Sequence, residues 1–340
     1  AFFMHGMSKA LKAMHDAAEP DTPLAVYYAY KQSEITKDGT RSPGWVSFLQ
    51  AVADAGLAVD ATWPVRTELS NRMIGMGTNA LASSIVHVCR KRDPLARSID
   101  LDEFKRILRR ELPDALTKIR AAGISVVDMP QASIGPGIGV FTRFASVLEP
   151  SGDVVNVGKA LQIVEEIIDE LESADEGVYD PETRFAIDWF AHAQWGKKPS
   201  GDADTMARPR NLGIEQLERA GIIEAHAGKT RLRTRAEIGG SYDPDRDATP
   251  TVWEHTMAIA HALEQGGQDR AAALFARLSN TESVRALGYR LGSICLKKHW
   301  PAEAQVWNRL AEEWRRIEDL AMSAPPPVQA PETDLFGGAA

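Results

Sequence analysis

Apolar positions in the first part of the chain switch between helical and strand-like spacing. The opening segment has apolar residues on one helical face, at Phe2, Phe3, Met7, Leu11 and Met14. Short apolar runs over 24–30, 57–65 and 82–88 predict strands, and 45–53 predicts a helix between the first two. This β-α-β-loop-β order, with strands expected to be buried on both faces, indicates the second half of an α/β sheet.

The opening helix has no start signal of its own, which favours a fragment whose upstream part is missing. Simple removal of an initiator methionine is the alternative. No basic leader with a small-residue cleavage site follows, so the pattern does not indicate a trimmed signal peptide.

The rest of the chain is mostly helical in pattern. Residues 101–121 predict an amphipathic helix, Ser133–Gly139 a structural turn, and 157–171 an acidic helix. A helix over 183–195, a loop to about 203, a helix over 211–220 and a hairpin over 222–233 follow the order of a winged-helix module. Three helical segments over 251–321, broken near 266–267 and 299–301, predict a small bundle.

We therefore expect a mixed α/β chain: the C-terminal half of a Rossmann-like sheet, a winged-helix-like module and a helical bundle. The expected domains are a sheet domain (1–95), a helical and loop connector (96–150), an acidic helix plus winged-helix-like module (151–248), the bundle (249–322) and a disordered tail (323–340).

Composition is that of an ordinary globular protein, with 44% hydrophobic and 25% charged residues and a net charge of −8. No apolar run is long enough to span a bilayer, so no membrane partner is expected. Only Cys89 and Cys295 are present, which predicts a reducing, cytoplasmic location and no zinc or disulfide framework.

Charge is unevenly distributed along the chain. Residues 149–188 hold 12 acids and 2 bases, whereas 206–235 holds 7 bases and 3 acids. The basic stretch favours either DNA contact or a solvated basic face. The candidate DNA-contacting residues in it are Arg208, Arg210, Lys229, Arg231 and Arg233.

Signatures of catalysis are scarce. The adjacent serines Ser83 and Ser84 lack a nucleophile elbow, and no histidines pair at metal-ligand spacing, so no metal residue is proposed. The most unusual segment, 61–77, places polar residues on a loop after a strand, where open α/β sheets bind ligands. They are Arg66, Glu68, Asn71 and Arg72, and the alternative is an ion pair that braces the loop.

Several long runs together carry a resemblance to a known family. They are Tyr27–Glu34, Gly44–Trp45 with Phe48–Val52, Ala61–Gly77, Asn79–Arg90, Ile134–Gly137, Ala227–Lys229, Thr251–Glu254 and Asp334–Phe336. The chain resembles large bacterial adenine-specific DNA methylases that carry an uncharacterised conserved N-terminal domain and a zinc-ribbon insert.

The resemblance implies methyl transfer from S-adenosylmethionine to the exocyclic amine of a flipped adenine in DNA, in host modification or phage defence. The Gly-rich cofactor loop and the Asp-Pro-Pro-Tyr motif of such enzymes do not occur in these 340 residues. We therefore assign no catalytic or cofactor residue here, and we expect the chain alone to be inactive and to bind no S-adenosylmethionine. The expected partners are DNA, the missing N-terminal half of the same polypeptide and other defence proteins.

The remaining candidates for shaping the pocket and holding DNA lie at the ends of the first two strands. They are Tyr28, Tyr30 and Lys31, together with the four polar residues of the 61–77 loop. Two other functions stay open: a non-catalytic DNA-binding or specificity module, and a protein-interaction scaffold.

Overall fold

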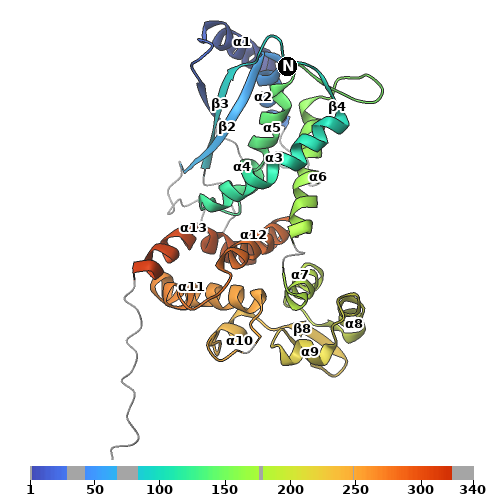
Figure 1. Ribbon diagram of the computed structural model, residues 1–340, viewed down its shortest axis with the longest axis vertical. Coiled ribbons are helices and arrows are strands. Elements are labelled where there is room, and N and C mark those ends of the chain that lie inside the picture. The colour runs from blue at the N-terminus through green and yellow to red at the C-terminus, as the bar shows by residue number, and fades with distance from the viewer. Residues whose placement is uncertain (1, 29–42, 67–82, 176–178, 248, 324–340) are drawn as a thin grey trace, which may run out of the picture.

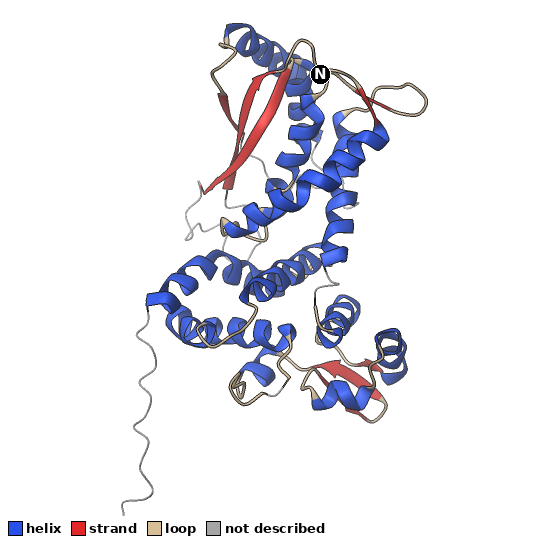
Figure 2. Ribbon diagram, in the orientation of Figure 1, coloured by secondary structure: helices blue, strands red, loops and turns tan. Residues whose placement is uncertain are grey.

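The computed structural model describes residues 2–28, 43–66, 83–175, 179–247 and 249–323. Figure 1 shows a sheet at one end of the molecule, a second, smaller sheet at the other end, and helices between them. Figure 2 shows that helices make up most of the described chain. The mixed α/β class expected from the sequence is confirmed.

The first sheet is built from β1 (Leu24–Tyr28), β2 (Leu57–Arg66) and β3 (Ser83–Lys91), in the order β1-β3-β2. Strand β3 is antiparallel to both neighbours, so β1 and β2 run in the same direction. Helix α2 (Pro43–Asp54) lies between them along the chain. The unit is therefore a βαβ crossover whose two parallel strands are separated by a third.

Only one face of this sheet is covered. The register aligns Tyr27, Val86 and Trp63 across the three strands on the other face, and Tyr27 and Trp63 are 69% and 62% exposed. Their neighbour Tyr28, one position along β1, turns to the covered face as the pleat requires. The expectation that the strands are buried on both faces is wrong for this sheet.

Helix α1 (Phe2–Ala17) packs against α2, and both contribute to the core on the covered face. Leu11 of α1 is buried there with Trp45, Phe48 and Leu49 of α2. A short parallel pair follows, formed by β4 (Ile99–Asp100) and β5 (Val147–Leu148).

Three helices complete this first core: α3 (Leu101–Ala121), α5 (Ile134–Arg143) and α6 (Val157–Asp175). The short helix α4 (Met129–Ala132) lies between α3 and α5 along the chain, and its Met129 packs against the second core. Helix α3 starts at the N-cap Asp100, whose carboxylate accepts from the Glu103 amide at 2.7 Å. Its buried residues follow a helical period along one face: Phe104, Ile107, Leu108, Leu112 and Leu116.

The glycine run Ser133–Gly139 forms most of helix α5, so the turn expected there is wrong. A Cβ on Gly135 would lie 1.6 Å from Thr62 Oγ1, and one on Gly139 would lie 2.9 Å from the Val59 carbonyl oxygen. The glycines thus let the α5 backbone approach β2 directly. Thr142, one turn further on, accepts from the Val59 amide at 2.9 Å.

The second core begins at α7 (Pro181–Ala193). The chain continues through β6 (Lys198–Pro199), α8 (Ser200–Ala207), a 3₁₀ turn (Arg208–Arg210), α9 (Ile214–Arg219), β7 (Ile223–His226), β8 (Lys229–Leu232) and α10 (Arg235–Gly239). Strands β6, β8 and β7 form an antiparallel sheet in that order. The loop expected up to 203 was wrong, because β6 and α8 occupy it.

Helices α11 (Val252–Phe275), α12 (Thr281–Lys297) and α13 (Pro301–Ser323) pack against one another. Gly267 adopts φ 66°, a left-handed conformation that interrupts α11 at the expected place. The expected break before Pro301 is also present. A further break at Asn280, also left-handed, was not expected from the sequence.

Helix α12 joins the two cores. Tyr289 donates to the Ile124 carbonyl at 2.6 Å, and Arg285 donates to the Arg120 carbonyl, so α12 covers the exposed carbonyls at the C-terminal end of α3. A Cβ on Gly292 would lie 2.4 Å from Val126 Cγ1, which shows how closely the helix approaches the α3–α4 connection. No helix in the described ranges is long and apolar enough to cross a membrane.

Candidate nucleic-acid interface

The first group of candidate residues surrounds the carboxyl ends of β1 and β2. Tyr28 is the last residue of β1, and its ring stacks on Phe48 with centroids 4.4 Å apart and lies 5.5 Å from Trp45. The ring therefore packs on helix α2. Tyr28 thus anchors the end of the strand.

The other candidates of this group continue beyond the described chain. Arg66 closes β2, paired in register with Ser83, and its side chain lies outside the described residues. Tyr30, Lys31, Glu68, Asn71 and Arg72 also lie outside them. Because β1 and β2 are parallel, both segments leave the sheet at the same end, separated by one strand, or roughly 10 Å.

Buried polar groups of two side chains in the middle of this sheet were missed. His87 of β3 is 2% exposed, and neither ring nitrogen has a hydrogen-bond partner in the described structure. Its cross-strand neighbour Thr62 has a buried hydroxyl that is likewise unpaired. Burial lowers the pKa of His87 to about 4, so the imidazole is neutral at pH 7.

His87 belongs to the aromatic cluster between the sheet and helix α2. Its ring lies 5.2 Å from Trp45 and 5.4 Å from Phe48, among the same aromatic residues that hold Tyr28. A neutral imidazole can donate at one nitrogen and accept at the other. The signal in the sequence is a single histidine inside the apolar run Ile85–Cys89.

The second group of candidates lies on and near the β7–β8 hairpin, where most of the arginines are neutralised. Arg231 pairs with Glu224 and with Glu237, the latter at 2.6 Å. The pKa of Glu237 is lowered to about 2, mainly because Arg231 donates to its carboxylate. Arg210 pairs with Asp188.

The remaining members of the group differ in whether their positive charge is paired with a carboxylate. Arg208 pairs with Asp204 at 2.5 Å, one turn earlier. Arg233 donates to the Glu237 carbonyl at 3.1 Å. Lys229 is exposed at the start of β8, and within the described part of the chain its ammonium makes no ion pair. Lys229 is thus the member with the most available charge.

Helix α9, the recognition helix in the winged-helix order expected from the sequence, exposes two acids and one base. Glu215 and Glu218 are exposed, and Glu218 accepts from the Ala225 amide of β7 at 2.8 Å. Arg219 is exposed on the same helix, so α9 carries no net positive charge that would attract a phosphate backbone. The exposed lysines here are Lys229, which starts β8, and Lys198 of β6, whose register partner is Thr230, the residue after Lys229.

The glycine run of α5 serves helix packing, and the described residues contain no group of metal ligands. The glycines of α5 pack closely against Thr62, Val59 and Val164. Their backbone amides therefore do not form a binding loop for a phosphate or a cofactor. No group of three or more His, Cys, Asp or Glu side chains within the described ranges could hold a metal ion.

Comparison with known proteins reaches only the second core. A family model described as a domain of unknown function, DUF8807, matches residues 180–334. The match runs from the N-cap of α7 past the end of α13, and so covers less than half of the chain. No curated protein and no solved structure matches the chain.

Proposed function

We propose that this chain is the C-terminal part of an adenine-specific DNA methyltransferase that uses S-adenosylmethionine. The observation that supports the proposal is the β1–α2–β2 crossover with antiparallel β3 inserted between its parallel strands. Doubly wound α/β sheets commonly carry one antiparallel strand. A Rossmann-like sheet that continues beyond β1 is consistent with this topology.

In this proposal, the segments that follow β1 and β2 together bind the DNA substrate. Residues after Tyr28 and after Val65 leave the same end of the sheet, where open α/β sheets bind their ligands. In this proposal they bind the target nucleotide and its phosphates. The cofactor loop and the Asp-Pro-Pro-Tyr motif come from a segment outside these 340 residues.

The test is methyl transfer to DNA by the longest polypeptide that the gene encodes, with product adenine identified by mass spectrometry. Arg66→Ala and Arg72→Ala should each lower methylation and DNA affinity, whereas Arg106→Ala, an exposed residue of α3, should change neither. Absence of N-methyladenine would contradict the proposed reaction. Saturable binding of S-adenosylmethionine to the isolated chain in calorimetry would contradict the proposed division of roles.

We also propose that the hairpin contacts the DNA backbone. The element order α7–β6–α8–α9–β7–β8, with the β6-β8-β7 sheet, is consistent with a winged-helix module. Because α9 exposes two acids and only one base, the contact is assigned to Lys229 of the hairpin and Lys198 of the adjacent strand β6. The contact is therefore electrostatic and independent of sequence.

This second proposal has its own measurement. The double variant Lys198→Ala/Lys229→Ala should reduce the slope of log affinity against log salt by about 2, since each phosphate contact releases about one counterion. Lys118→Ala, an exposed lysine of α3, serves as the control and should leave the slope unchanged. An unchanged slope in the double variant would contradict the contact, and salt-insensitive association with a protein partner would favour a scaffold.

A further inference from the structure

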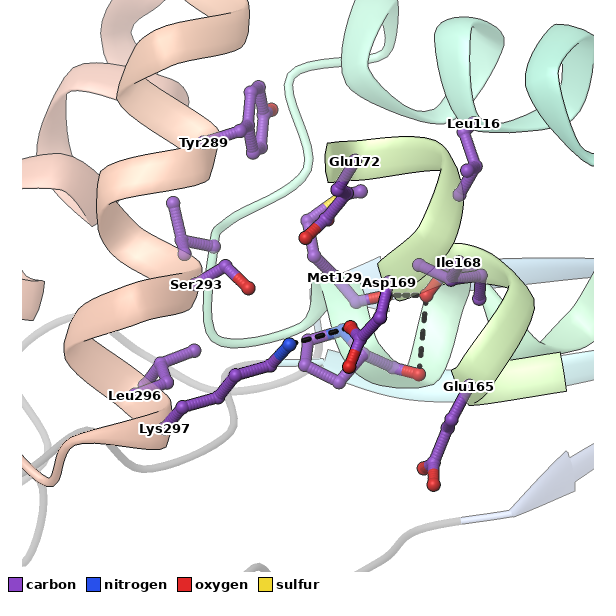
Figure 3. Close-up of a pocket in the computed structure, with 13 residues that line it drawn as sticks. Leu116, Met129, Glu165, Ile168, Asp169, Glu172, Tyr289, Ser293, Leu296 and Lys297 are labelled. Atoms are coloured by element: carbon purple, nitrogen blue, oxygen red, sulfur yellow. Dashed lines mark hydrogen bonds and ion pairs between the residues drawn. The ribbon is translucent and has the colours of Figure 1, made fainter. Parts of the chain in front are cut away.

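A cavity of about 270 Å³ lies between α12 on one side and α6 with the α3–α4 region on the other. Figure 3 shows side chains from these elements converging on it. Its lining comes from both cores, with Leu116 and Ile168 from the first and Tyr289 from the second. Sites for small molecules occur preferentially at such boundaries between packed units. Nothing in the proposed methyl transfer uses this cavity.

Most of the cavity wall is apolar. Besides Leu116 and Ile168, the side chains of Val126, Met129 and Leu296 line it. A dry apolar cavity of about 150 Å³ is large enough to bind benzene. The space here therefore accommodates an aromatic ring together with a short substituent.

The charged side chains of the lining are already engaged within the protein. Lys297 Nζ lies 2.6 Å from Asp169 Oδ1, and Glu172 Oε2 lies 3.2 Å from Arg290 Nη1. The third carboxylate of the lining, that of Glu165, also interacts with a neighbour. A charged ligand would therefore have to break one of these interactions or leave its own charge without a counter-ion, and either costs free energy. The lining thus favours an uncharged ligand.

One hydroxyl group of the lining differs from the others. The Ser133 hydroxyl donates to the Met129 carbonyl, and the Tyr289 hydroxyl donates to the Ile124 carbonyl, both at 2.6 Å. The Ser293 hydroxyl instead points into the cavity from the middle of α12 and makes no hydrogen bond within the described part of the chain. A hydroxyl can both donate and accept, so Ser293 offers one hydrogen-bonding position on an otherwise apolar wall.

We propose that this cavity binds a small uncharged molecule with one aromatic ring and one hydroxyl group. The ring lies against the apolar wall, and its burial supplies the affinity. The ligand hydroxyl forms a hydrogen bond with Ser293. Charged analogues bind poorly, because they lose water without gaining a counter-ion. A bound molecule contacts both cores.

The experiment titrates the full chain at neutral pH with three probes of similar size: benzyl alcohol, which is uncharged, benzylamine, which is a cation, and benzoate, which is an anion. Amide shifts in ¹⁵N NMR report where each probe binds. Benzyl alcohol should bind saturably with Kd on the order of 1 mM and should shift the amides of Ser293, Leu296 and Ile168. Benzylamine and benzoate should each bind at least about tenfold more weakly.

The hydrogen bond to Ser293 has its own test. Ser293→Ala should weaken binding of benzyl alcohol roughly fivefold, the usual effect of losing one neutral hydrogen bond. The same variant should leave the affinity for toluene unchanged, because toluene has the ring without the hydroxyl. Ser241→Ala, an exposed serine outside the lining, is the control and should change neither affinity.

Four results would overturn the proposal. They are no saturable binding of benzyl alcohol, amide shifts scattered outside the cavity, binding of either charged probe as tight as that of benzyl alcohol, and an unchanged affinity for benzyl alcohol in Ser293→Ala.

Discussion

The carboxylate of Asp180 accepts a hydrogen bond from the backbone amide of Val252 at 3.0 Å, across 72 residues of sequence. The same side chain caps its own helix α7, accepting from the Thr183 amide at 2.6 Å. The Thr183 hydroxyl donates to Asp180 and accepts from the Trp253 amide at 2.9 Å. One carboxylate and one hydroxyl thus serve the first amides of two helices, and they fix the start of α11 against the start of α7.

This double cap predicts an unusually large effect of Asp180→Ala. Losing one N-cap costs about 1 kcal/mol, so losing two should lower the free energy of unfolding by about 2 kcal/mol or more. Asp100→Ala removes the cap of α3 alone and is the matched control, with an expected loss of about 1 kcal/mol. Urea unfolding measures both. Equal losses would show that the Val252 contact contributes nothing.

A second prediction concerns Arg235, which connects α10 to the bundle. Its guanidinium lies 5.7 Å from the Trp195 ring and 5.6 Å from the Trp307 ring, and it pairs with Glu264 and Glu303. The Glu303 side chain is only 9% exposed, so Arg235→Ala leaves a buried carboxylate without its cation.

We expect Arg235→Ala to lower the free energy of unfolding by about 3–5 kcal/mol, the usual result of breaking a buried pair. Arg246→Ala is the control, because its pair with Asp243 is exposed and should contribute less than about 1 kcal/mol. Arg235→Lys should fall between the two, since lysine keeps the charge without the planar group that stacks on tryptophan. A loss from Arg235→Ala no larger than that of the control would contradict this account.

The third prediction tests the close contact between α5 and β2. A Cβ on Gly139 would lie 2.9 Å from the Val59 carbonyl oxygen, which is backbone and cannot rotate away. Gly139→Ala should therefore lower the unfolding free energy by about 1–3 kcal/mol through overpacking. Gly201→Ala in helix α8, where nothing lies within 4 Å, should instead be neutral or stabilise by up to about 1 kcal/mol. Thermal unfolding of the two alanine variants distinguishes these outcomes, and similar losses at both positions would contradict the packing argument.

Periodicity predicted the long helices well because burial of one face dominates their stability. The expected helix over 101–121 has the bounds of α3, whose apolar residues all face one core. Local pattern failed at α5, because glycines that favour a turn in isolation are required there by contacts with Thr62, Val59 and Val164. Strand β6 was missed because two residues carry no periodic signal.

In the candidate sites, too, the sequence shows which charged residues are present but not which residues they contact. The number of arginines in and near the hairpin follows from the sequence. The sequence does not show that Arg231 pairs with Glu224 and Glu237, or that Arg210 pairs with Asp188. The acidic stretch likewise reads as a solvated face, although Asp169 and Glu172 pair with Lys297 and Arg290 of α12. The fold brings charged residues from distant segments together, so these ion pairs could not be predicted from the sequence alone.

The last prediction compares two capping boxes of the same type. Thr234 and Glu237 cap α10, and Thr251 and Glu254 cap α11. The pKa of Glu237 is lowered to about 2, mainly by Arg231, whereas burial raises the pKa of Glu254 to about 7. The two boxes should therefore respond to pH in opposite directions.

Glu254 binds its proton more tightly in the folded chain than in the unfolded chain, so its contribution to stability is full below pH 4.5 and is lost as pH rises toward 7. Glu237 contributes above pH 4.5 and loses its contribution as pH falls toward 2. Relative to the wild type, Glu254→Gln should accordingly make the change in urea-unfolding free energy from pH 4.5 to 7 more positive, while Glu237→Gln should leave that change as it is in the wild type. The comparison with the wild type is needed because the buried, neutral His87 changes stability in the opposite direction over the same interval. The same pH dependence in the wild type and in Glu254→Gln would contradict the role assigned to Glu254.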